Sequence, residues 1–183
     1  MGTLQGVTVG FIGLDPMAKQ MALRVQEAGA ETYAFHASPA IRYEIARAKI
    51  NLCGSAAEIA RKVSGGIILL KIDSPRDLEE ILTGDNALLA HVTKQTLIID
   101  VGTTPVTTTQ KFAKMAAARG AHWIDAPAIG DEITASRGEL ELNVGASDED
   151  YNQVHALLSC LGNKISHVGE LGAGQSQAFA LQH

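Results

Sequence analysis

The segment between residues 13 and 18 has the spacing of a turn that holds phosphate. It reads Gly13-Leu14-Asp15-Pro16-Met17-Ala18, follows a short apolar run and opens a helical pattern. A dinucleotide-binding turn needs glycine at its first and third positions and glycine or alanine at its sixth, because backbone amides must approach a pyrophosphate closely. Gly13 and Ala18 meet this pattern. Asp15 stands where the middle glycine belongs, so the turn has one altered position.

Asp15 disfavours the phosphate binding that its position in the turn implies. An aspartate followed by proline is a favourable start for a helix, and its carboxylate would take amides that otherwise hold phosphate. Pro16 has no amide to offer. Two unit charges about 4 Å apart at an effective dielectric near 20 repel by ~4 kcal/mol, roughly a thousandfold in affinity. Either Asp15 simply caps its own helix, or a metal ion, protonation or a shifted pose restores phosphate binding.

The end of the second expected strand lacks the acidic residue that would hold an adenosine ribose. The sequence there is Tyr33-Ala34-Phe35-His36-Ala37-Ser38. His36 is a candidate for a ribose hydrogen bond or for a partly exposed structural histidine. Ser38 and Arg42 are candidates for contact with a 2′-phosphate. The usual pattern of selectivity for NAD is therefore missing.

Short aliphatic runs alternate with helical patterns along the chain, which is typical of parallel strands with helices on both faces of the sheet. Strands are expected at residues 7–12, 32–35, 50–53, 66–70, 96–101, 122–125, 140–144 and 164–168. Helices are expected at residues 16–29, 40–48, 56–63, 107–119 and 148–161, after Ser74, and after the last glycines; residues 126–139 are expected to form a loop. The expected caps of three of these helices are Ser55, Ser74 and Ser147. The predicted fold class is α/β, a Rossmann-like, doubly wound, mostly parallel sheet.

Composition excludes several classes of partner. The chain has a net charge of −5, so neither nucleic acid nor a membrane surface is an expected partner. The longest apolar runs have the length of strands and no signal peptide is apparent, so a cytoplasmic protein is expected. Cys53 and Cys160 lie far apart in no metal or redox spacing and are expected to be small buried side chains.

Three ordered groups of residues run through essentially the whole chain. They are Val9-Gly10-Phe11-Ile12-Gly13-Leu14 with Met17, Met21-Ala22 and Ala28-Gly29; Asp125-Ala126-Pro127 with Gly130, Ala135, Gly138, Leu140 and Val144-Gly145; and Gly169, Gly172, Gly174 and Gln175. This series resembles the 3-hydroxyisobutyrate dehydrogenase (β-hydroxyacid dehydrogenase) family of the 6-phosphogluconate dehydrogenase superfamily. The resemblance identifies the chain as the N-terminal NAD(P)-binding domain of such a protein.

The resemblance implies a chemistry. Members oxidise a 3-hydroxy acid with NAD or NADP, or run the reverse reduction. A lysine on the long helix after the glycine-rich turn acts as general acid and base, and an asparagine nearby positions the substrate. A Ser-Gly-Gly segment binds the substrate carboxylate, and a threonine after the fifth strand lies near the nicotinamide.

Most of these positions have changed in this chain. The lysine falls on Ala178, which cannot transfer a proton, and the asparagine pair falls on Leu181 and Gln182. The substrate-binding segment falls on Ile129-Gly130-Asp131, which loses the hydroxyl and places an anion where a carboxylate should bind. The proline that usually ends the fourth strand falls on Asp73. Thr103 keeps the expected residue type, which is also common in plain turns and caps.

By resemblance, the residues at cofactor-contacting positions are Gly13, Leu14, Asp15, Pro16, Met17, His36, Ser38 and Thr103. Because of Asp15, weak or absent binding of NADP or NAD is expected. The resemblance also places a boundary, with residues 1–171 forming the Rossmann-type domain and residues 172–183 beginning the family's long interdomain helix. The helical second domain that closes the active site and forms the dimer is then missing from this chain, and a homo-oligomer is an open expectation.

Two interpretations of function remain open. The first is a catalytically disabled relative with a binding, assembly or regulatory role, alone or within a larger polypeptide. The second is a diverged NAD(P)-dependent oxidoreductase acting on a 3-hydroxy acid or a non-carboxylate substrate, for which Lys71 is a candidate replacement base. His122, Asp125 and Asp131 are not expected to bind metal, since the first two lie on opposite faces of a strand. Ser176 has no neighbouring base and is not an expected nucleophile.

Overall fold

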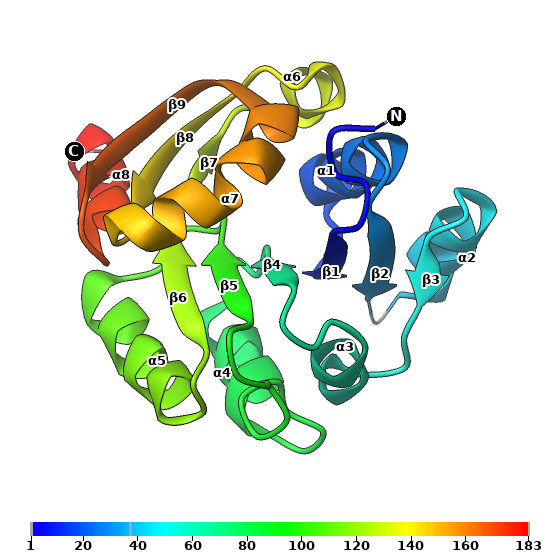
Figure 1. Cartoon of the computed structure of the whole chain (residues 1–183), viewed down its shortest axis with the longest axis horizontal. Helices are drawn as coiled ribbons and strands as arrows, with labels where there is room; N and C mark the ends of the chain where they lie inside the picture. Colours follow the sequence, from blue (N-terminus) through cyan, green and yellow to red (C-terminus); the bar gives the residue numbers. More distant parts are fainter. Residues whose placement is uncertain (1, 37, 183) are drawn as a thin grey trace.

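The computed structural model describes residues 2–36 and 38–182, in which strands and helices alternate as predicted (Figure 1). Met1, Ala37 and His183 lie outside the described residues. The strands are β1 (Thr8–Ile12), β2 (Glu31–Phe35), β3 (Asn51–Leu52), β4 (Ile67–Leu70), β5 (Leu97–Asp100), β6 (His122–Asp125), β7 (Ala128–Ile129), β8 (Leu140–Gly145) and β9 (Gly162–Gly169). The helices are α1 (Pro16–Glu27), α2 (Pro39–Arg47), α3 (Ala56–Lys62), α4 (Pro75–Thr83), α5 (Val106–Ala118), α6 (Glu132–Arg137), α7 (Asp148–Leu161) and α8 (Ala173–Leu181). The predicted Rossmann-like α/β fold is confirmed.

The sheet has the strand order β3-β2-β1-β4-β5-β6-β8-β7, with β9 paired to β8. Strands β1 to β6 pair in parallel. The chain proceeds outward from β1 through β2 and β3, then returns to place β4 on the other side of β1. The carboxyl ends of β1 and β4 therefore flank the reversal of strand order, which is where open α/β sheets bind their ligands.

The far end of the sheet departs from the predicted pattern of parallel strands. β8 pairs antiparallel with β6 and β7, and β9 runs parallel to β8. The prediction of a loop at residues 126–139 is wrong in part, because this segment contains β7 and α6. Both elements are too short to show a clear hydrophobic period.

Successive side chains along each strand point to opposite faces of the sheet and pack into two separate apolar cores, one on each face. On one face, Phe11, Leu69 and Ile99 pack with residues of α1, α2, α6 and α7. On the other face, Ile68 and Ile98 pack with residues of α3, α4 and α5. Helices on both faces bury β4 completely, which explains its unbroken apolar sequence.

Serine side chains begin three of the helices as the sequence predicts. Ser55, Ser74 and Ser147 each accept a hydrogen bond from the backbone amide three residues later. These bonds satisfy amides that have no partner within the helix. Ser38 precedes α2, but its side chain makes no capping bond.

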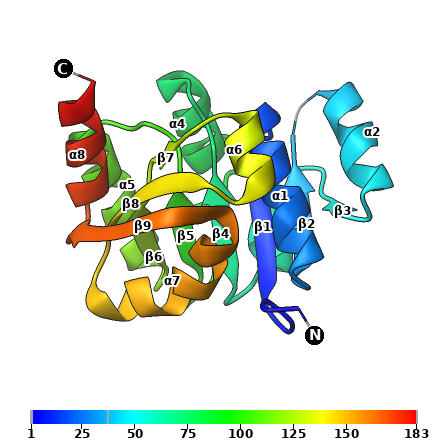
Figure 2. The same ribbon diagram turned by 90° about the horizontal axis from the view of Figure 1, so that it is seen from above.

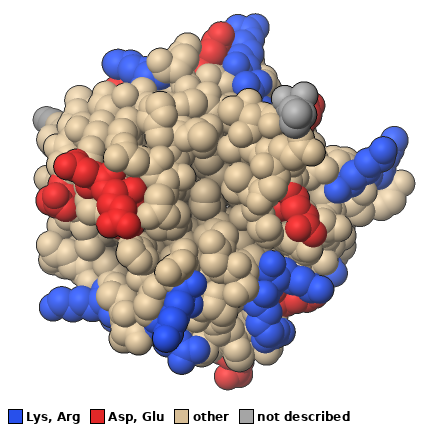
Figure 3. All heavy atoms as spheres, in the orientation of Figure 1, with Lys and Arg blue, Asp and Glu red and all other residues tan. Residues whose placement is uncertain are grey.

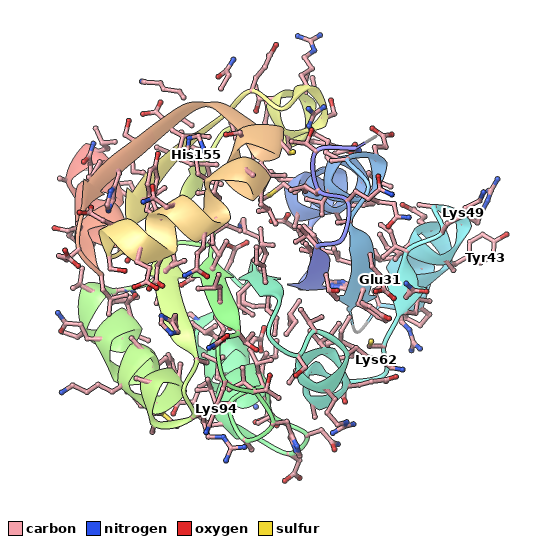
Figure 4. The ribbon with its side chains drawn as sticks, viewed as in Figure 1. Glu31, Tyr43, Lys49, Lys62, Lys94 and His155 are labelled. Carbon is pink, nitrogen blue, oxygen red and sulfur yellow. The ribbon has the colours of Figure 1, made fainter. Side chains whose placement is uncertain are left out.

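Helices α2 and α8 lie at opposite ends of the molecule in both views (Figures 1 and 2). Tyr43 and Lys49 project outward from the α2 end (Figure 4). On the face in Figure 3, acidic side chains gather over the start of α7. The first turn of α7 contains Asp148, Glu149 and Asp150, and negative charge at a helix N-terminus is favoured by the helix dipole.

Within the described ranges, no helix is both long and apolar enough to cross a bilayer.

Gly13 and Gly6 provide a matched test of the turn after β1. Both have a left-handed backbone, with φ of 84° and 85°, but a Cβ at Gly13 would collide with the Lys71 carbonyl oxygen whereas a Cβ at Gly6 would meet open space. We expect Gly6→Ala to lower the free energy of unfolding by about 1 kcal/mol, from backbone strain alone. Gly13→Ala should cost about 3 kcal/mol or more, because β4 must also move. Denaturant unfolding measures both, and equal losses would contradict the predicted clash.

Candidate functional site

A cleft of about 400 Å³ lies at the carboxyl ends of β1 and β4. Gly13, Leu14 and Asp15 line it from the turn after β1. His36 lines it from the end of β2, and Lys71 from the end of β4. The parallel register of β1 with β2 and β4 brings these three segments together. The cleft is therefore at the position that the strand order favours for a ligand.

The Asp15 carboxylate is occupied on both oxygens. Oδ1 accepts a hydrogen bond of 2.7 Å from the backbone amide of Ala18, so the prediction that Asp15 caps its own helix is confirmed. Oδ2 lies 3.1 Å from the Lys71 ammonium nitrogen. The positive charge of Lys71 therefore partly offsets the repulsion that the Asp15 carboxylate would exert on a phosphate.

Lys71 lies between two carboxylates. Its Nζ is 2.6 Å from Asp73 Oδ1 as well as 3.1 Å from Asp15 Oδ2, and its side chain is only 11% exposed. Burial alone would lower the pKa of Lys71, but hydrogen bonds and the charges of Asp73 and Asp15 outweigh burial and raise it. Lys71 thus points into the cleft as a protonated ammonium, which is the wrong state for a general base.

His36 takes up a second amide of the turn. Its Nδ1 accepts a hydrogen bond of 3.3 Å from the Leu14 amide, so the ring proton of the neutral histidine is on Nε2. Burial lowers the pKa of the His36 imidazole, which favours this neutral form. Two amides of the turn, those of Leu14 and Ala18, therefore already have acceptors within the chain.

The other predicted cofactor positions are divided between core and surface. The Leu14 side chain is buried, and Met17 packs against the apolar core. Pro16 is the first residue of α1. Ser38 is half-buried and does not line the cleft, and Arg42 is exposed on α2. The structure thus brings Gly13, Asp15 and His36 together, and adds Lys71 to them.

Thr103 lies at a second pocket, of about 430 Å³, between the segment after β5 and α8. Its side chain is exposed, whereas the neighbouring Thr104 is buried. The Thr104 hydroxyl donates to Asp100 Oδ2 at 2.6 Å, and its amide donates to Gln175 Oε1 at 3.0 Å. Thr103 therefore stays at the surface of the pocket while Thr104 joins a buried network.

Two buried carboxylates anchor the start of α8 in a network that was not predicted from the sequence. Asp125 accepts hydrogen bonds from the Gly172 amide at 2.6 Å and the Gln175 amide at 2.8 Å. Asp100 accepts from the Gly102 amide at 3.0 Å, and the Gln175 side chain donates to the Gly102 carbonyl at 2.8 Å. Polar residues at the ends of two adjacent apolar strands, Asp100 and Asp125, were the available signal.

The residues at the positions of the implied substrate chemistry lie on β7, at the start of α6 and on α8. Ala178 is 6% exposed on the inner face of α8. Ile129 ends β7 and is exposed, and Asp131 begins α6 with its carboxylate accepting the Thr134 amide at 2.8 Å. Hydrogen bonds from Thr134 lower the pKa of Asp131. Gly130 has a φ of 151°, between these two residues.

The remaining candidate side chains have structural environments. His122 is exposed and lies 2.9 Å from Asp150, whereas Asp125 is buried, so the two ends of β6 face different surroundings. Cys53 is buried as predicted, and burial raises the pKa of its thiol to about 11. Cys160 is only half-buried, which differs from the prediction.

A family model described as the NAD binding domain of 6-phosphogluconate dehydrogenase matches residues 8–169. The chain belongs to this family. The resemblance inferred from the glycine series and from Asp125-Ala126-Pro127 is thereby confirmed. The matched NAD-binding-domain region includes the cleft and ends just before α8.

Curated proteins similar to this chain include a dehydrogenase and a reductase. The chain is 30% identical to 2-(hydroxymethyl)glutarate dehydrogenase of Eubacterium barkeri over 94% of this chain and 56% of the relative. It is 31% identical to 2-hydroxy-3-oxopropionate reductase of Escherichia coli K12, over 95% of this chain and 59% of the relative. The chain spans little more than half the length of these relatives.

Solved structures agree in fold. A putative oxidoreductase from Mycobacterium avium 104 superposes with a TM-score of 0.86 at 28% identity, covering 95% of this chain and 61% of that chain. Mycobacterium tuberculosis 3-hydroxyisobutyrate dehydrogenase with L-serine gives a TM-score of 0.88 at 24% identity, covering 96% and 58%. The second likeness supports the fold alone.

The buried network at α8 predicts a dependence of stability on pH. Burial raises the pKa of Asp100 to about 7, although hydrogen bonds from Thr104 and Gly102 oppose the shift. The folded state then binds more protons than the unfolded state between about pH 4 and 7, so stability falls as pH rises through this window. We expect a loss on the order of 2–4 kcal/mol from this carboxyl.

Urea unfolding at several pH values measures this slope in wild type and in Asp100→Asn. The substitution should make the slope shallower, because one titrating carboxyl is gone; Asp125, whose pKa burial also raises, keeps the remainder. Asp85→Asn changes an exposed carboxyl and is the matched control, which should keep the wild-type slope. An unchanged slope in Asp100→Asn would contradict the assignment.

Proposed function

We propose that this chain is the NAD(P)-binding-type domain of a 3-hydroxyisobutyrate dehydrogenase-like protein that is catalytically disabled and serves a binding, assembly or regulatory role. The observation that carries the proposal is the Asp15 carboxylate, which occupies the Ala18 amide and the Lys71 ammonium within the phosphate-binding turn. The residues of this turn do not fit a pyrophosphate as they stand. Weak or absent binding of NAD or NADP is therefore part of the proposal.

Electrostatics in the cleft support weak cofactor binding. Among the described residues that line the cleft, Asp15, Asp73 and Asp77 carry negative charge, Lys71 is the single cation, and His36 is neutral. A pyrophosphate would add negative charges to a site where carboxylates already outnumber ammonium groups. The helix N-terminus favours an anion, but Asp15 already supplies that anion.

Proton transfer lacks a suitable residue. Ala178 stands at the lysine position of the family and has no ionisable group. Lys71, the candidate replacement, is held protonated by Asp15 and Asp73 and follows β4, beside the turn after β1. The second candidate function, a diverged NAD(P)-dependent oxidoreductase acting on a 3-hydroxy acid or a non-carboxylate substrate, is favoured by one observation: Lys71 places a cation beside the phosphate-binding turn.

We expect no NAD(P)-dependent oxidation of 3-hydroxy acids by this chain or by a longer protein that contains it. A general acid or base typically contributes about 10²–10⁴-fold to the rate, and that group is missing. Absorbance of NADH or NADPH at saturating substrate is the measurement. Turnover above the protein-free rate would contradict catalytic disablement and favour the diverged oxidoreductase.

Cofactor titration of Asp15 variants tests the cause of weak binding. We expect wild type to bind NADH and NADPH only weakly, and Asp15→Gly to bind them at least about a hundredfold more tightly, because charge and side chain are both removed. Asp15→Asn keeps a good helix cap without the charge, so its affinity should lie between the two.

Glu44→Gln is the control for this series. Glu44 pairs with Lys19 on the surface of α2 at 2.8 Å and does not line the cleft, yet its substitution changes the net charge by the same amount as Asp15→Asn. Its cofactor affinity should match wild type. Asp15→Gly that binds no better than wild type would contradict the proposed block.

A further inference from the structure

We propose that the Asp15 carboxylate is a built-in anionic ligand of the cleft and that Lys71, which it masks, determines the ligand specificity. With Asp15 in place, the cleft favours an uncharged nucleoside over the corresponding nucleotide. With Asp15 removed, the Lys71 ammonium becomes a phosphate ligand. This inference deepens the proposed function and rests on it.

Asp15 joins the two kinds of donor that phosphate sites combine. Its Oδ1 receives the Ala18 amide at 2.7 Å, and its Oδ2 lies 3.1 Å from Lys71 Nζ. Amides at a helix N-terminus and cationic side chains are the groups that recognise phosphate oxygens. A phosphate group in place of this carboxylate would meet the same two donors. The wild-type protein therefore satisfies its phosphate-binding donors internally.

Lys71 has anchors other than Asp15. Its backbone amide donates to the Ile12 carbonyl at 3.0 Å, which continues the β1–β4 register beyond the strand end. Its ammonium also pairs with Asp73 at 2.6 Å, although that carboxylate is 67% exposed and the contact is screened by water. Removal of Asp15 therefore leaves Lys71 at the cleft with a free donor.

The rest of the cleft suits an uncharged ligand with an apolar part. Apolar side chains from the ends of β1 and β2 and from α2 and α4 line it, namely Ile12, Phe35, Ile41, Ile72 and Ile81. Its volume of about 400 Å³ is within the range of small-ligand sites. A nucleoside presents an aromatic base to these walls without adding a negative charge to Asp15, Asp73 and Asp77. A nucleotide of the same base adds the charge that the cleft disfavours.

Calorimetric titration with adenosine and with AMP tests the proposal in wild type, Asp15→Gly, Lys71→Met and the double variant. Wild type should bind adenosine more tightly than AMP. Asp15→Gly should raise AMP affinity about a hundredfold, and Lys71→Met on that background should remove about tenfold or more of the gain, which is the usual contribution of a charged hydrogen bond. Adenosine affinity should stay within about threefold in all four proteins.

Parallel variants keep the result decisive. Asp15→Asn retains the helix cap. If glycine disturbs α1, Asp15→Asn alone can be compared with Asp15→Asn combined with Lys71→Met. Glu44→Gln should leave both ligands unaffected. The proposal is overturned if the double variant binds AMP as tightly as Asp15→Gly, if adenosine affinity rises in step with AMP, or if wild type prefers AMP.

The outcomes separate the two proposals. Tight NADH binding or turnover by wild type contradicts the proposed function whatever Lys71 does. Loss of the AMP gain on Lys71→Met supports the specificity role even in that case. An AMP gain that is independent of Lys71 contradicts only the further inference. The affinity for AMP should also fall more steeply with added salt in Asp15→Gly than in the double variant. The reason is that salt screens the charge pair between Lys71 and the phosphate, which only Asp15→Gly can form.

Discussion

The contact of the Asp15 carboxylate with the first turn of α1 and with Lys71 is the central polar interaction of the cleft. It joins the amide of Ala18 to an ammonium that follows the neighbouring strand. Each partner alone is ordinary, since aspartate is a frequent helix cap and lysine a frequent surface cation. Together they place an anion and its counter-charge where the strand order reverses, so the scaffold of a nucleotide-binding fold is retained while its phosphate-binding donors are engaged.

A second buried network organises the other end of the sheet. Asp100 and Asp125, side by side on β5 and β6, are tied through Gln175 and Gly172 to the beginning of α8. Burial of a carboxylate is unfavourable unless its oxygens receive hydrogen bonds, and both receive them here. The network keeps α8 at a fixed place on the sheet. Because burial raises the pKa of Asp100 to about 7, this anchor is expected to be sensitive to pH.

Most of the fold was predictable because its signals are local or periodic. Apolar runs flanked by helical patterns located β1 to β6 and the longer helices, and serine caps located three helix starts. The short β7 and α6 were missed because two and six residues are too few for a period to be visible. The antiparallel direction of β8 was also missed. The residue pattern of a strand indicates which side chains are buried, but not whether the adjacent strand runs parallel or antiparallel to it.

The sequence by itself determined the fold class, the family and the glycine at Gly13, and it made Asp15 a candidate helix cap. Each of these depends on residue types at short spacing, where backbone geometry leaves few choices. Only the tertiary structure decided the partner of Asp15, the hydrogen bond from the Leu14 amide to His36 and the burial of Asp100 and Asp125. These depend on strand register, which brings residues that are distant in sequence within hydrogen-bonding distance, and no local pattern encodes that pairing. The balance of charge in the cleft therefore depends on the tertiary structure, which places the Lys71 ammonium beside Asp15 and Asp73.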